Sequence, residues 1–376
     1  MKIEHNKPGY ILALTLALMA LFMFIATYVS NKGLIFSSFS KTMVDREKAR
    51  QLAYGGIQLA ISQLSVKEAV RKAQDESKEQ KESADAKSSG GQGNAKDGVK
   101  KAEQPSDGKQ LLKVLLPNKG RLQKFNLKQN IDGITGTLGI MIASEEGKIN
   151  INRMYDFEKH KFVGEPVPGS KQEAKDETNM KKMLQELFGQ IREQMGADLF
   201  GEFEKFLKER KYPVNDVTEL LTIKGFDAFK NSIFYDPTIA GQKGSQLYLT
   251  DIFTVSSSKQ SIEPWLISNS LASLLKLQGD PEKAPATDEL LKVFKEKSDW
   301  KNDWNKSLKN LYGVEFAGLP KFVTPLLNPV FDPKMFSVFS YATIGSVTVR
   351  LIALLEREKS GKDGQVEVKI RGIYLI

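Results

Sequence analysis

The stretch YILALTLALMALFMFIATYVS, residues 10–30, decides how the rest of this chain is interpreted, because it contains no charged side chain. A run of roughly 20 apolar residues is the length that an α-helix needs to cross a bilayer. A polar segment, MKIEHNKPG, occupies residues 1–9 and ends at Gly9. The sequence therefore predicts a short leader over 1–9 and a transmembrane helix over 10–30.

Three kinds of N-terminal signal contain such a run. A cleaved secretory signal is disfavoured, because the run is too long and is followed by Asn31, Lys32 and Gly33 rather than by a small-residue cleavage site. A plain signal anchor fits the length. A type IV pilin-like signal fits as well, and a dedicated peptidase would then cut between Gly9 and Tyr10, where the glycine presents an open backbone.

The helical pattern continues beyond the apolar run. From residue 42 to residue 64 the chain reads TMVDREKARQLAYGGIQLAISQL, with apolar residues at three-to-four spacing on one face. These residues are Ala49, Leu52, Ala53, Ile57, Ala60, Ile61 and Leu64. As one rod, residues 10–66 would be roughly 85 Å long, with bends expected at Gly33 and at the pair Gly55 and Gly56. An apolar half followed by an amphipathic half is the plan of a pilin helix, whose second half lies against a globular head.

Composition divides the rest of the chain. Residues 67–110 contain no Leu, Ile, Phe, Tyr or Trp, so they cannot bury enough apolar area to offset the entropy of ordering, and we expect a flexible polar linker. Strand patterns occupy 134–142, 147–151, 335–341, 346–355 and 365–375, and helical patterns occupy 180–195, 198–211, 217–223 and 264–277.

These patterns predict an α+β fold with three parts. A long N-terminal transmembrane and amphipathic helix spans 10–66. A pilin-like antiparallel sheet is built from 111–152 and 334–376, and a large, mainly helical domain is inserted over 153–333. The net charge is +9, but the charges are interspersed, which favours a solvated surface over a nucleic-acid footprint.

Several segments, taken in order, resemble the general secretion pathway protein K family, the large minor pseudopilins of type II secretion systems. They are GYILALTLALMALF after the leader, GITGTLGIMIASEEGKININ (133–152), VNDVTELLTIKGF (214–226), LYLTDIFTV (247–255) and FSVFSYATIGSVTVRLIALLERE (336–358). Together they cover about half of the chain. At the fifth position of the predicted mature chain, where most pilins carry glutamate, this sequence has Leu14, which is a feature of the K family.

The resemblance implies a protein without enzymatic activity that caps and initiates a periplasmic pseudopilus. Its implied partners are the other minor and major pseudopilins, the prepilin peptidase and the inner-membrane assembly platform, with no nucleic acid. Its implied location is the bacterial inner membrane, as a single-pass protein whose globular part lies in the periplasm. We expect Leu14, Leu18, Phe22 and Ile25 to pack against neighbouring subunits. No cofactor is expected except calcium, whose ligands cannot be identified, because DLFGEFEKFLKERKYP (198–213) replaces the Asp-rich run of the family.

One rival hypothesis is a membrane-anchored DNA-binding or DNA-uptake protein. The segment TELLTIKGFD (218–227) resembles half of a helix-hairpin-helix motif, but Asp227 stands where a second glycine would contact phosphate. A helix end capped by Gly225 is the simpler interpretation.

Catalytic chemistry has little support. The only histidines are His5 and His160, there is no cysteine, and no nucleophile, zinc or phosphate-loop motif is present. We expect Glu145 and Glu146 to lie in a solvated turn. Trp265, Trp300 and Trp304 are expected as core or interface anchors.

Overall fold

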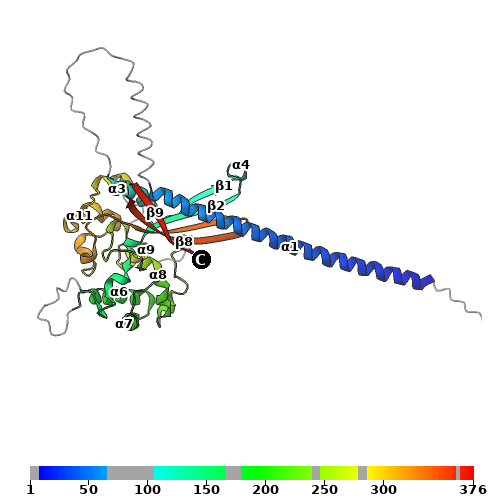
Figure 1. The fold of residues 1–376 in the computed structure, drawn as a ribbon, viewed down its shortest axis with the longest axis horizontal. Helices are drawn as coiled ribbons and strands as arrows, with labels where there is room; N and C mark the ends of the chain where they lie inside the picture. Colours follow the sequence, from blue (N-terminus) through cyan, green and yellow to red (C-terminus); the bar gives the residue numbers. More distant parts are fainter. Residues whose placement is uncertain (1–7, 66–105, 166–178, 239–245, 278–285, 361–364) are drawn as a thin grey trace, which may run out of the picture.

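A single helix of 57 residues, α1 (Pro8–Leu64), runs from a projecting rod into a globular head (Figure 1). The computed structural model describes residues 8–65, 106–165, 179–238, 246–277, 286–360 and 365–376. The predicted linker 67–110 lies mostly outside these ranges, and the description resumes at Ser106, which caps α3 (Asp107–Leu115). The helix is longer at its start than the predicted 10–66, because it begins at Pro8.

A five-stranded antiparallel sheet forms the centre of the head, in the order β1-β2-β7-β8-β9. Its strands are β1 (Gln123–Leu127), β2 (Gly136–Ser144), β7 (Met335–Ile344), β8 (Val347–Ser360) and β9 (Gln365–Leu375). Segments far apart in sequence therefore meet, since β2 pairs along its length with β7. The predicted strands 134–142, 335–341, 346–355 and 365–375 are confirmed.

The amphipathic half of α1 packs on one face of this sheet. Ala49, Ala53, Ile57 and Ala60 are fully buried, as the three-to-four spacing predicts. On the sheet side, alternate residues of β2, β7 and β8 meet the helix because side chains on a strand point to opposite faces in turn. These residues are Leu138, Ile140, Ile142, Val338, Ser340, Ala342, Val349, Leu351, Ala353 and Leu355.

The helix lies unusually close to the sheet at Gly56. A Cβ at this position would stand 2.3 Å from Ser340 Oγ and 2.9 Å from Ile140 Cγ2. The Ser340 hydroxyl in turn donates a 2.8 Å hydrogen bond to the Ala53 carbonyl. The expected bends at Gly33 and at Gly55–Gly56 are wrong, because α1 is one continuous helix through all three glycines. Gly56 permits close packing rather than a bend.

Arg357 on β8 joins the end of α1 to the start of α3. Its side chain is buried, its Nε donates to the Leu64 carbonyl at 3.0 Å, and one of its terminal nitrogens lies 2.7 Å from Asp107 Oδ1. The guanidinium thus bonds a carbonyl of the last helical turn, which has no other partner among the residues that the structure describes. The Arg357 side chain therefore holds together Leu64, where α1 ends, and Asp107, where α3 begins.

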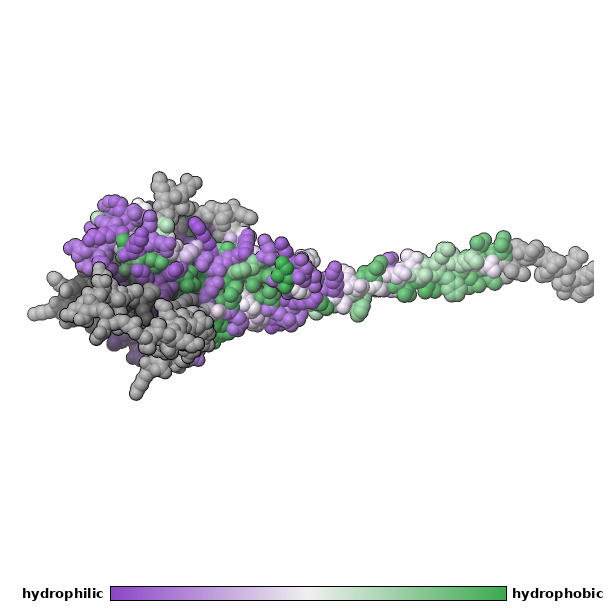
Figure 2. Space-filling view, turned by 90° about the horizontal axis from the view of Figure 1, so that it is seen from above, coloured by the Kyte–Doolittle hydropathy of each residue, from purple (hydrophilic) through white to green (hydrophobic). Residues whose placement is uncertain are grey.

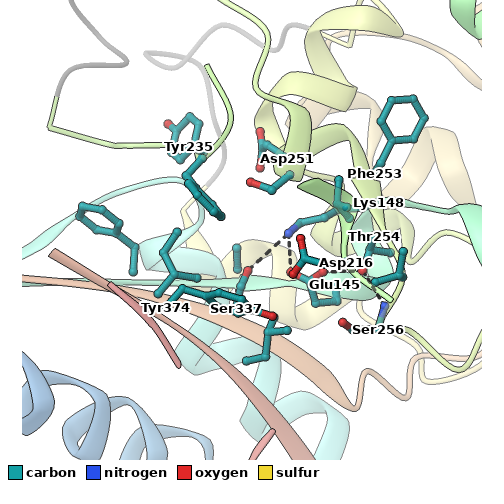
Figure 3. Close-up of a pocket in the computed structure, with 18 of the residues that line it drawn as sticks. Glu145, Lys148, Asp216, Tyr235, Asp251, Phe253, Thr254, Ser256, Ser337 and Tyr374 are labelled. Carbon is teal, nitrogen blue, oxygen red and sulfur yellow. Dashed lines mark hydrogen bonds and ion pairs between the residues drawn. The ribbon is translucent and has the colours of Figure 1, made fainter. Parts of the chain in front are cut away.

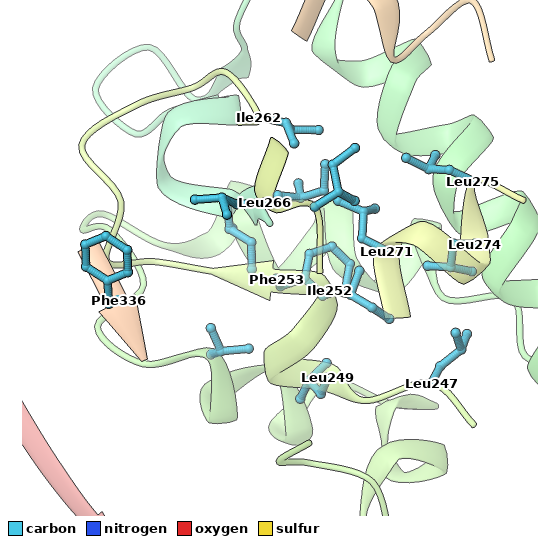
Figure 4. Packing of buried hydrophobic residues seen from close by; sticks show 14 of the residues in the cluster. Leu247, Leu249, Ile252, Phe253, Ile262, Leu266, Leu271, Leu274, Leu275 and Phe336 are labelled. Atoms are coloured by element: carbon cyan, nitrogen blue, oxygen red, sulfur yellow. The ribbon is translucent and has the colours of Figure 1, made fainter. Parts of the chain in front are cut away.

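The region between β2 and β7 contains short helices, 3₁₀ turns and two small strand pairs around a second part of the same core (Figure 4). Its longest helices are α6 (Met180–Met195) and α7 (Phe200–Glu209), which confirm two of the predicted helices. The remaining helices are α5 (Ile151–Met154), α8 (Leu249–Ile252), α9 (Asn269–Leu274), α10 (Thr287–Val293), α11 (Trp300–Ser307) and α12 (Lys309–Tyr312). The strands are β3 (Ile149–Asn150), β4 (Tyr155–Asp156), β5 (Lys161–Phe162) and β6 (Phe253–Thr254).

The short helical turns complete the fold. They are η1 (Leu116–Asn118), η2 (Glu145–Gly147), η4 (Val217–Thr222), η5 (Phe226–Phe229), η7 (Pro264–Leu266), η8 (Phe316–Gly318) and η9 (Thr324–Leu326), and α4 (Gln129–Asp132) turns the β1–β2 connection. The predicted helix over 264–277 is split by Ser268, which caps α9 through its hydroxyl. The predicted strand over 147–151 is reduced to β3, which pairs in parallel with β6 rather than extending the main sheet.

Two asparagines fasten the inserted region to the end of β3. Asn152 pairs with both backbone groups of Val214, accepting from its N–H and donating to its carbonyl, each at 2.8 Å. Asn150 is buried and donates to the carbonyls of Ser257 and Lys259. Since each amide satisfies backbone groups of a loop distant in sequence, these contacts fix how the loops lie against the sheet. The fold as a whole is α+β, with a long N-terminal apolar helix, an antiparallel sheet and additional helices, as the sequence predicts.

Candidate functional site

The first candidate site is the exposed half of α1. Residues 12–44 are all exposed, and an apolar band runs along the rod in Figure 2. Within the helix an 18-residue window reaches a mean hydropathy of 2.3 with none of its surface buried in the protein. By length and composition, α1 can cross a membrane.

The predicted packing residues lie on this surface. Leu14, Leu18, Phe22 and Ile25 follow one another at intervals of four, four and three, and their exposed fractions are 51%, 45%, 66% and 47%. That spacing places them on one face of the helix. The predicted cleavage site at Gly9 lies within the first turn of α1, and its cleavage stays a prediction.

The apolar surface continues well past the predicted transmembrane segment. Its further members are exposed as well; they are Leu34, Ile35, Phe36, Phe39, Met43 and Val44. The first α1 residue buried in the head is Ala49. About 30 Å of helix therefore separates the end of the predicted span at residue 30 from the head.

The second candidate site is a cavity between the other face of the sheet and the inserted region (Figure 3). Its volume is ≈100 Å³. Its sheet wall is apolar and includes Met141, Phe339 and Ile352, with Tyr374 of β9 at one side. The opposite wall comes from the residues around η4 and from the segment that contains α8 and β6.

A buried ion pair forms the polar side of this cavity. Lys148 contacts Glu145, and each of the two side chains is only 5% exposed. Thr254 Oγ1 donates to the second Glu145 oxygen at 2.5 Å, and Lys148 Nζ also lies 3.4 Å from Ser337 Oγ. The solvated turn expected at Glu145 is therefore wrong. The sequence signal for this pair is a glutamate that directly follows a buried strand and precedes a lysine by three residues.

Two further carboxylates line the cavity without a cation. Asp251 is 6% exposed and accepts a 2.6 Å hydrogen bond from the Ser270 N–H. Asp216 accepts from the Thr218 N–H at 2.7 Å and caps η4. Neither forms an ion pair with any residue that the structure describes. Burial raises the pKa of the Asp251 carboxyl, although the charge of Lys148 opposes the shift.

Lys119 lies in a smaller cavity next to Asp251. Its Nζ is 2.6 Å from the Tyr312 hydroxyl, which in turn donates to the Pro264 carbonyl at 2.6 Å. Burial lowers the pKa of Lys119 to about 7, and the negative charge of Asp251 partly offsets that shift. At neutral pH this lysine therefore carries only part of a positive charge.

Two further buried carboxyl groups, those of Glu146 and Glu263, lie near η2 but do not line the cavity. Glu146 is 1% exposed and accepts hydrogen bonds from the N–H groups of Lys334 and Met335. Glu263 is fully buried, and one of its oxygens has no partner among the described residues. Burial raises the pKa of both carboxyls, and that of Glu263 lies well above its ordinary value. The solvated turn expected at Glu146 is also wrong.

Among the described residues, neither the histidine nor the acidic side chains form a catalytic or metal centre of the kinds considered from the sequence. His160 is exposed in the β4–β5 turn, and His5 lies outside the described residues. In the described part of the chain there is no cluster of three His, Cys, Asp or Glu side chains that could hold a metal ion. In the segment that replaces the Asp-rich run, Glu204 is engaged by Lys181 and Lys208. The calcium implied by the resemblance stays a prediction.

The helix-hairpin-helix interpretation also fails geometrically. Gly225 has a left-handed φ of 93° and links η4 to η5, which are 3₁₀ turns of six and four residues. The expected C-terminal cap is wrong, because Gly225 stands at the N-cap of η5. The motif needs two α-helices to aim backbone amides at a phosphate. Trp265, Trp300 and Trp304 are buried, which confirms their expected role as core anchors.

No family model matches the chain, and no curated protein matches it. Among solved structures, it is similar to a chain of the GspK–GspI–GspJ complex from the type 2 secretion system of enterotoxigenic Escherichia coli. The two chains share 13% sequence identity, with a TM-score of 0.37, and the similarity covers 82% of this chain and 99% of that chain. The functional assignment therefore depends on the geometry of α1 and of the cavity.

Proposed function

We propose that this chain is a pilin-like structural subunit, namely a minor pseudopilin of a type II secretion system or of a related type IV pilus-like machine. In this role it caps and initiates a periplasmic fibre and has no catalytic activity. The observation that carries the proposal is the length of the apolar surface on α1. From residue 12 to residue 44 this surface extends for about 50 Å, whereas the hydrocarbon core of a bilayer is about 30 Å thick.

A bilayer alone cannot cover such a surface. The part beyond the membrane would expose Ile35, Phe36 and Phe39 to water, where large contiguous apolar patches mark interaction sites. The seam of Leu14, Leu18, Phe22 and Ile25 continues at three-to-four spacing through Val29, Phe36, Phe39 and Met43, interrupted only by Lys32. This is the repeat by which helices pack side by side along their length. Neighbouring helices of a fibre would cover it both inside and outside the membrane.

The position in the fibre is proposed from two features. Leu14 replaces the glutamate by which a pilin is thought to neutralise the N-terminal amine of a neighbour, so this subunit has no carboxylate to offer to one. The large inserted region widens the head beyond what the sheet and α1 need. Both features suit a subunit at the tip, with the head in the periplasm and α1 stored in the inner membrane before assembly. The proposed partners are the other pseudopilins, the prepilin peptidase and the assembly platform.

Processing tests the proposal first. The chain is co-expressed with a prepilin peptidase, and the N-terminus of the product is sequenced. We expect a start at Tyr10, and we expect Gly9→Ala to abolish it. An intact Met1, under conditions in which a control pilin is processed, would refute the pilin-like role.

Cross-linking tests the helix seam separately, and the absence of native cysteine makes the labelling clean. Phe39→Cys lies on the seam, whereas Ser37→Cys, two residues away, lies on another face of the same exposed helix. In membranes of cells that contain the other pseudopilins, we expect a cross-linker to capture a partner helix at position 39 and not at position 37. Equal capture at both positions would exclude a specific helix seam.

A further inference from the structure

The cavity between the sheet and the inserted region has the features of a pocket for one basic side chain. We infer that it receives a lysine or arginine side chain from an extended segment of a partner protein, whose backbone lies along the open edge of β9. The inference goes beyond the proposed function, because it holds whether or not α1 enters a fibre.

The charges in the cavity call for a cation. Glu145 and Lys148 form an ion pair, whereas Asp251 and Asp216 have no ion-pair partner among the described residues, although the charge of Lys148 also acts on Asp251. Asp251 is nine-tenths buried, and the hydrogen bond from Ser270 offsets only part of the cost of burying a carboxylate. Buried charges in proteins are normally paired or coordinate an ion. Lys119, whose charge interacts with that of Asp251, has its Nζ 2.6 Å from the Tyr312 hydroxyl.

The size of the cavity limits what the cation can be. Sites for cofactors and drug-sized ligands usually measure about 300–1,000 Å³, whereas this cavity measures ≈100 Å³. That volume suits the end of one long side chain rather than a nucleotide or another cofactor. Within the described residues, the lining also lacks the cluster of ligands that a metal ion would need.

The walls match the shape of a lysine or arginine side chain. Tyr235, Phe339 and Tyr374 line the cavity together with the aliphatic side chain of Ile352. A basic side chain buries its methylene stem against apolar surface and places its charge near carboxylates or aromatic rings. The cavity offers the apolar stem surface and the two carboxylates in one place (Figure 3).

The adjoining strand explains why the ligand is part of a polypeptide. β9 is the last strand of the sheet, and among the described strands it pairs only with β8. Tyr374 belongs to β9 and lines the cavity, and Leu375 beside it is 60% exposed. An edge strand presents unpaired N–H and C=O groups to a new strand. When an extended segment adds to an edge, main-chain hydrogen bonds supply affinity and a side-chain pocket supplies specificity.

The test uses the full chain in a mild detergent and a set of synthetic peptides, acetyl-Thr-Val-Thr-X-Thr-Val-Thr-amide, with X as Arg, Lys, Gln or Glu. Isothermal titration calorimetry measures each dissociation constant. We expect the Arg or Lys peptide to bind about tenfold or more tightly than the Gln peptide, and the Glu peptide to bind most weakly. Equal affinity across the four peptides, or no binding of the Arg peptide at about 1 mM, would overturn the inference.

Variants identify the site. Asp251→Asn keeps an acceptor for the Ser270 N–H but removes the charge, and we expect it to weaken the Arg peptide about tenfold. Asp227→Asn, an exposed acid away from the cavity, is the matched control and should leave binding unchanged. Ala143→Leu fills the cavity without altering charge and should abolish binding, so the inference stays testable if Asp251→Asn does not fold. Unchanged binding in both cavity variants would place the peptide elsewhere.

A last arm separates a polypeptide from a free small molecule. Agmatine carries the guanidinium of arginine on an aliphatic stem but has no peptide backbone. If the edge of β9 contributes, the Arg peptide binds about tenfold or more tightly than agmatine. Agmatine binding as tightly as the peptide would contradict a polypeptide ligand and assign the pocket to free guanidines or amines.

Discussion

The pair Gly55 and Gly56 offers a direct test of how closely α1 lies on the sheet. The two glycines are neighbours in one helix but differ in their surroundings. A Cβ at Gly55 would meet nothing within 4 Å, whereas a Cβ at Gly56 would stand 2.3 Å from Ser340 Oγ. Alanine at either position gains about 0.5–1 kcal/mol from the lower entropy of the unfolded chain. Only Gly56→Ala has to offset a steric clash.

The expected magnitude at Gly56 follows from its neighbours. The new methyl would also lie 2.9 Å from Leu138 Cδ1 and Ile140 Cγ2, and overpacking of a well-filled core costs about 1–3 kcal/mol. Moving Ser340 aside breaks its buried hydrogen bond to Ala53, and an unsatisfied buried hydroxyl costs about 1–3 kcal/mol more. We therefore expect Gly56→Ala to lower the free energy of unfolding by about 1–5 kcal/mol overall.

Urea denaturation of the full chain in a mild detergent measures both variants, with tryptophan fluorescence as the signal. The tryptophans lie in the same continuous core as the buried face of α1, so they report on loss of this packing. Gly55→Ala should be neutral or slightly stabilised. A double variant, Gly56→Ala with Ser340→Gly, should recover part of the loss, because it removes the closest contact. The reasoning would be refuted if Gly56→Ala were as stable as Gly55→Ala.

Three further predictions concern buried polar groups of the head. Arg357→Ala removes the buried guanidinium that bonds the Leu64 carbonyl and contacts the Asp107 carboxylate, so it should lower the free energy of unfolding by about 1–3 kcal/mol in urea denaturation, and an unchanged free energy of unfolding would argue against the junction. Asn152→Ala removes both hydrogen bonds to the backbone N–H and carbonyl of Val214 and should cost about 1–3 kcal/mol by the same measurement. Glu263 holds its proton in the folded state at pH values where the unfolded side chain, with a pKa near 4.5, has lost it. Stability should therefore fall as the pH rises above about 4.5, and Glu263→Gln should flatten this fall in a series of unfolding curves; an unchanged pH profile would contradict the assignment.

The elements with a strong local pattern could be predicted from the sequence. The buried face of α1 followed from three-to-four spacing, and β9 followed from the alternation of Val366, Val368 and Ile370 with polar residues. The α+β class and the burial of the tryptophans were predicted as well. In each case one repeating pattern decides which side chains are buried, so no distant contact is needed to infer them.

What the sequence could not show depends on contacts between distant segments. Glu145 and Glu146 looked like a solvated turn, but the loops that bury them begin more than one hundred residues later, at Thr254 and Lys334. Gly56 looked like a hinge, because the partner that requires a glycine, Ser340, lies on another element. The cavity could not be foreseen for the same reason, since its walls come from β2, β6, β7, β8 and β9 and from the segments around η2, η4 and α8.

The guanidinium of Arg357 has a practical consequence for how the protein can be altered. Arg357 holds Leu64 and Asp107 together, so the polypeptide leaves the head and returns to it at one place. The fold of the head therefore does not depend on the length of the chain between these two residues. A flexible insertion that doubles its length adds only about 0.6 kcal/mol of closure entropy. The stretch is therefore a suitable position for an affinity tag or a fluorescent domain, which would make it possible to follow the protein in living cells with α1 and the sheet left intact.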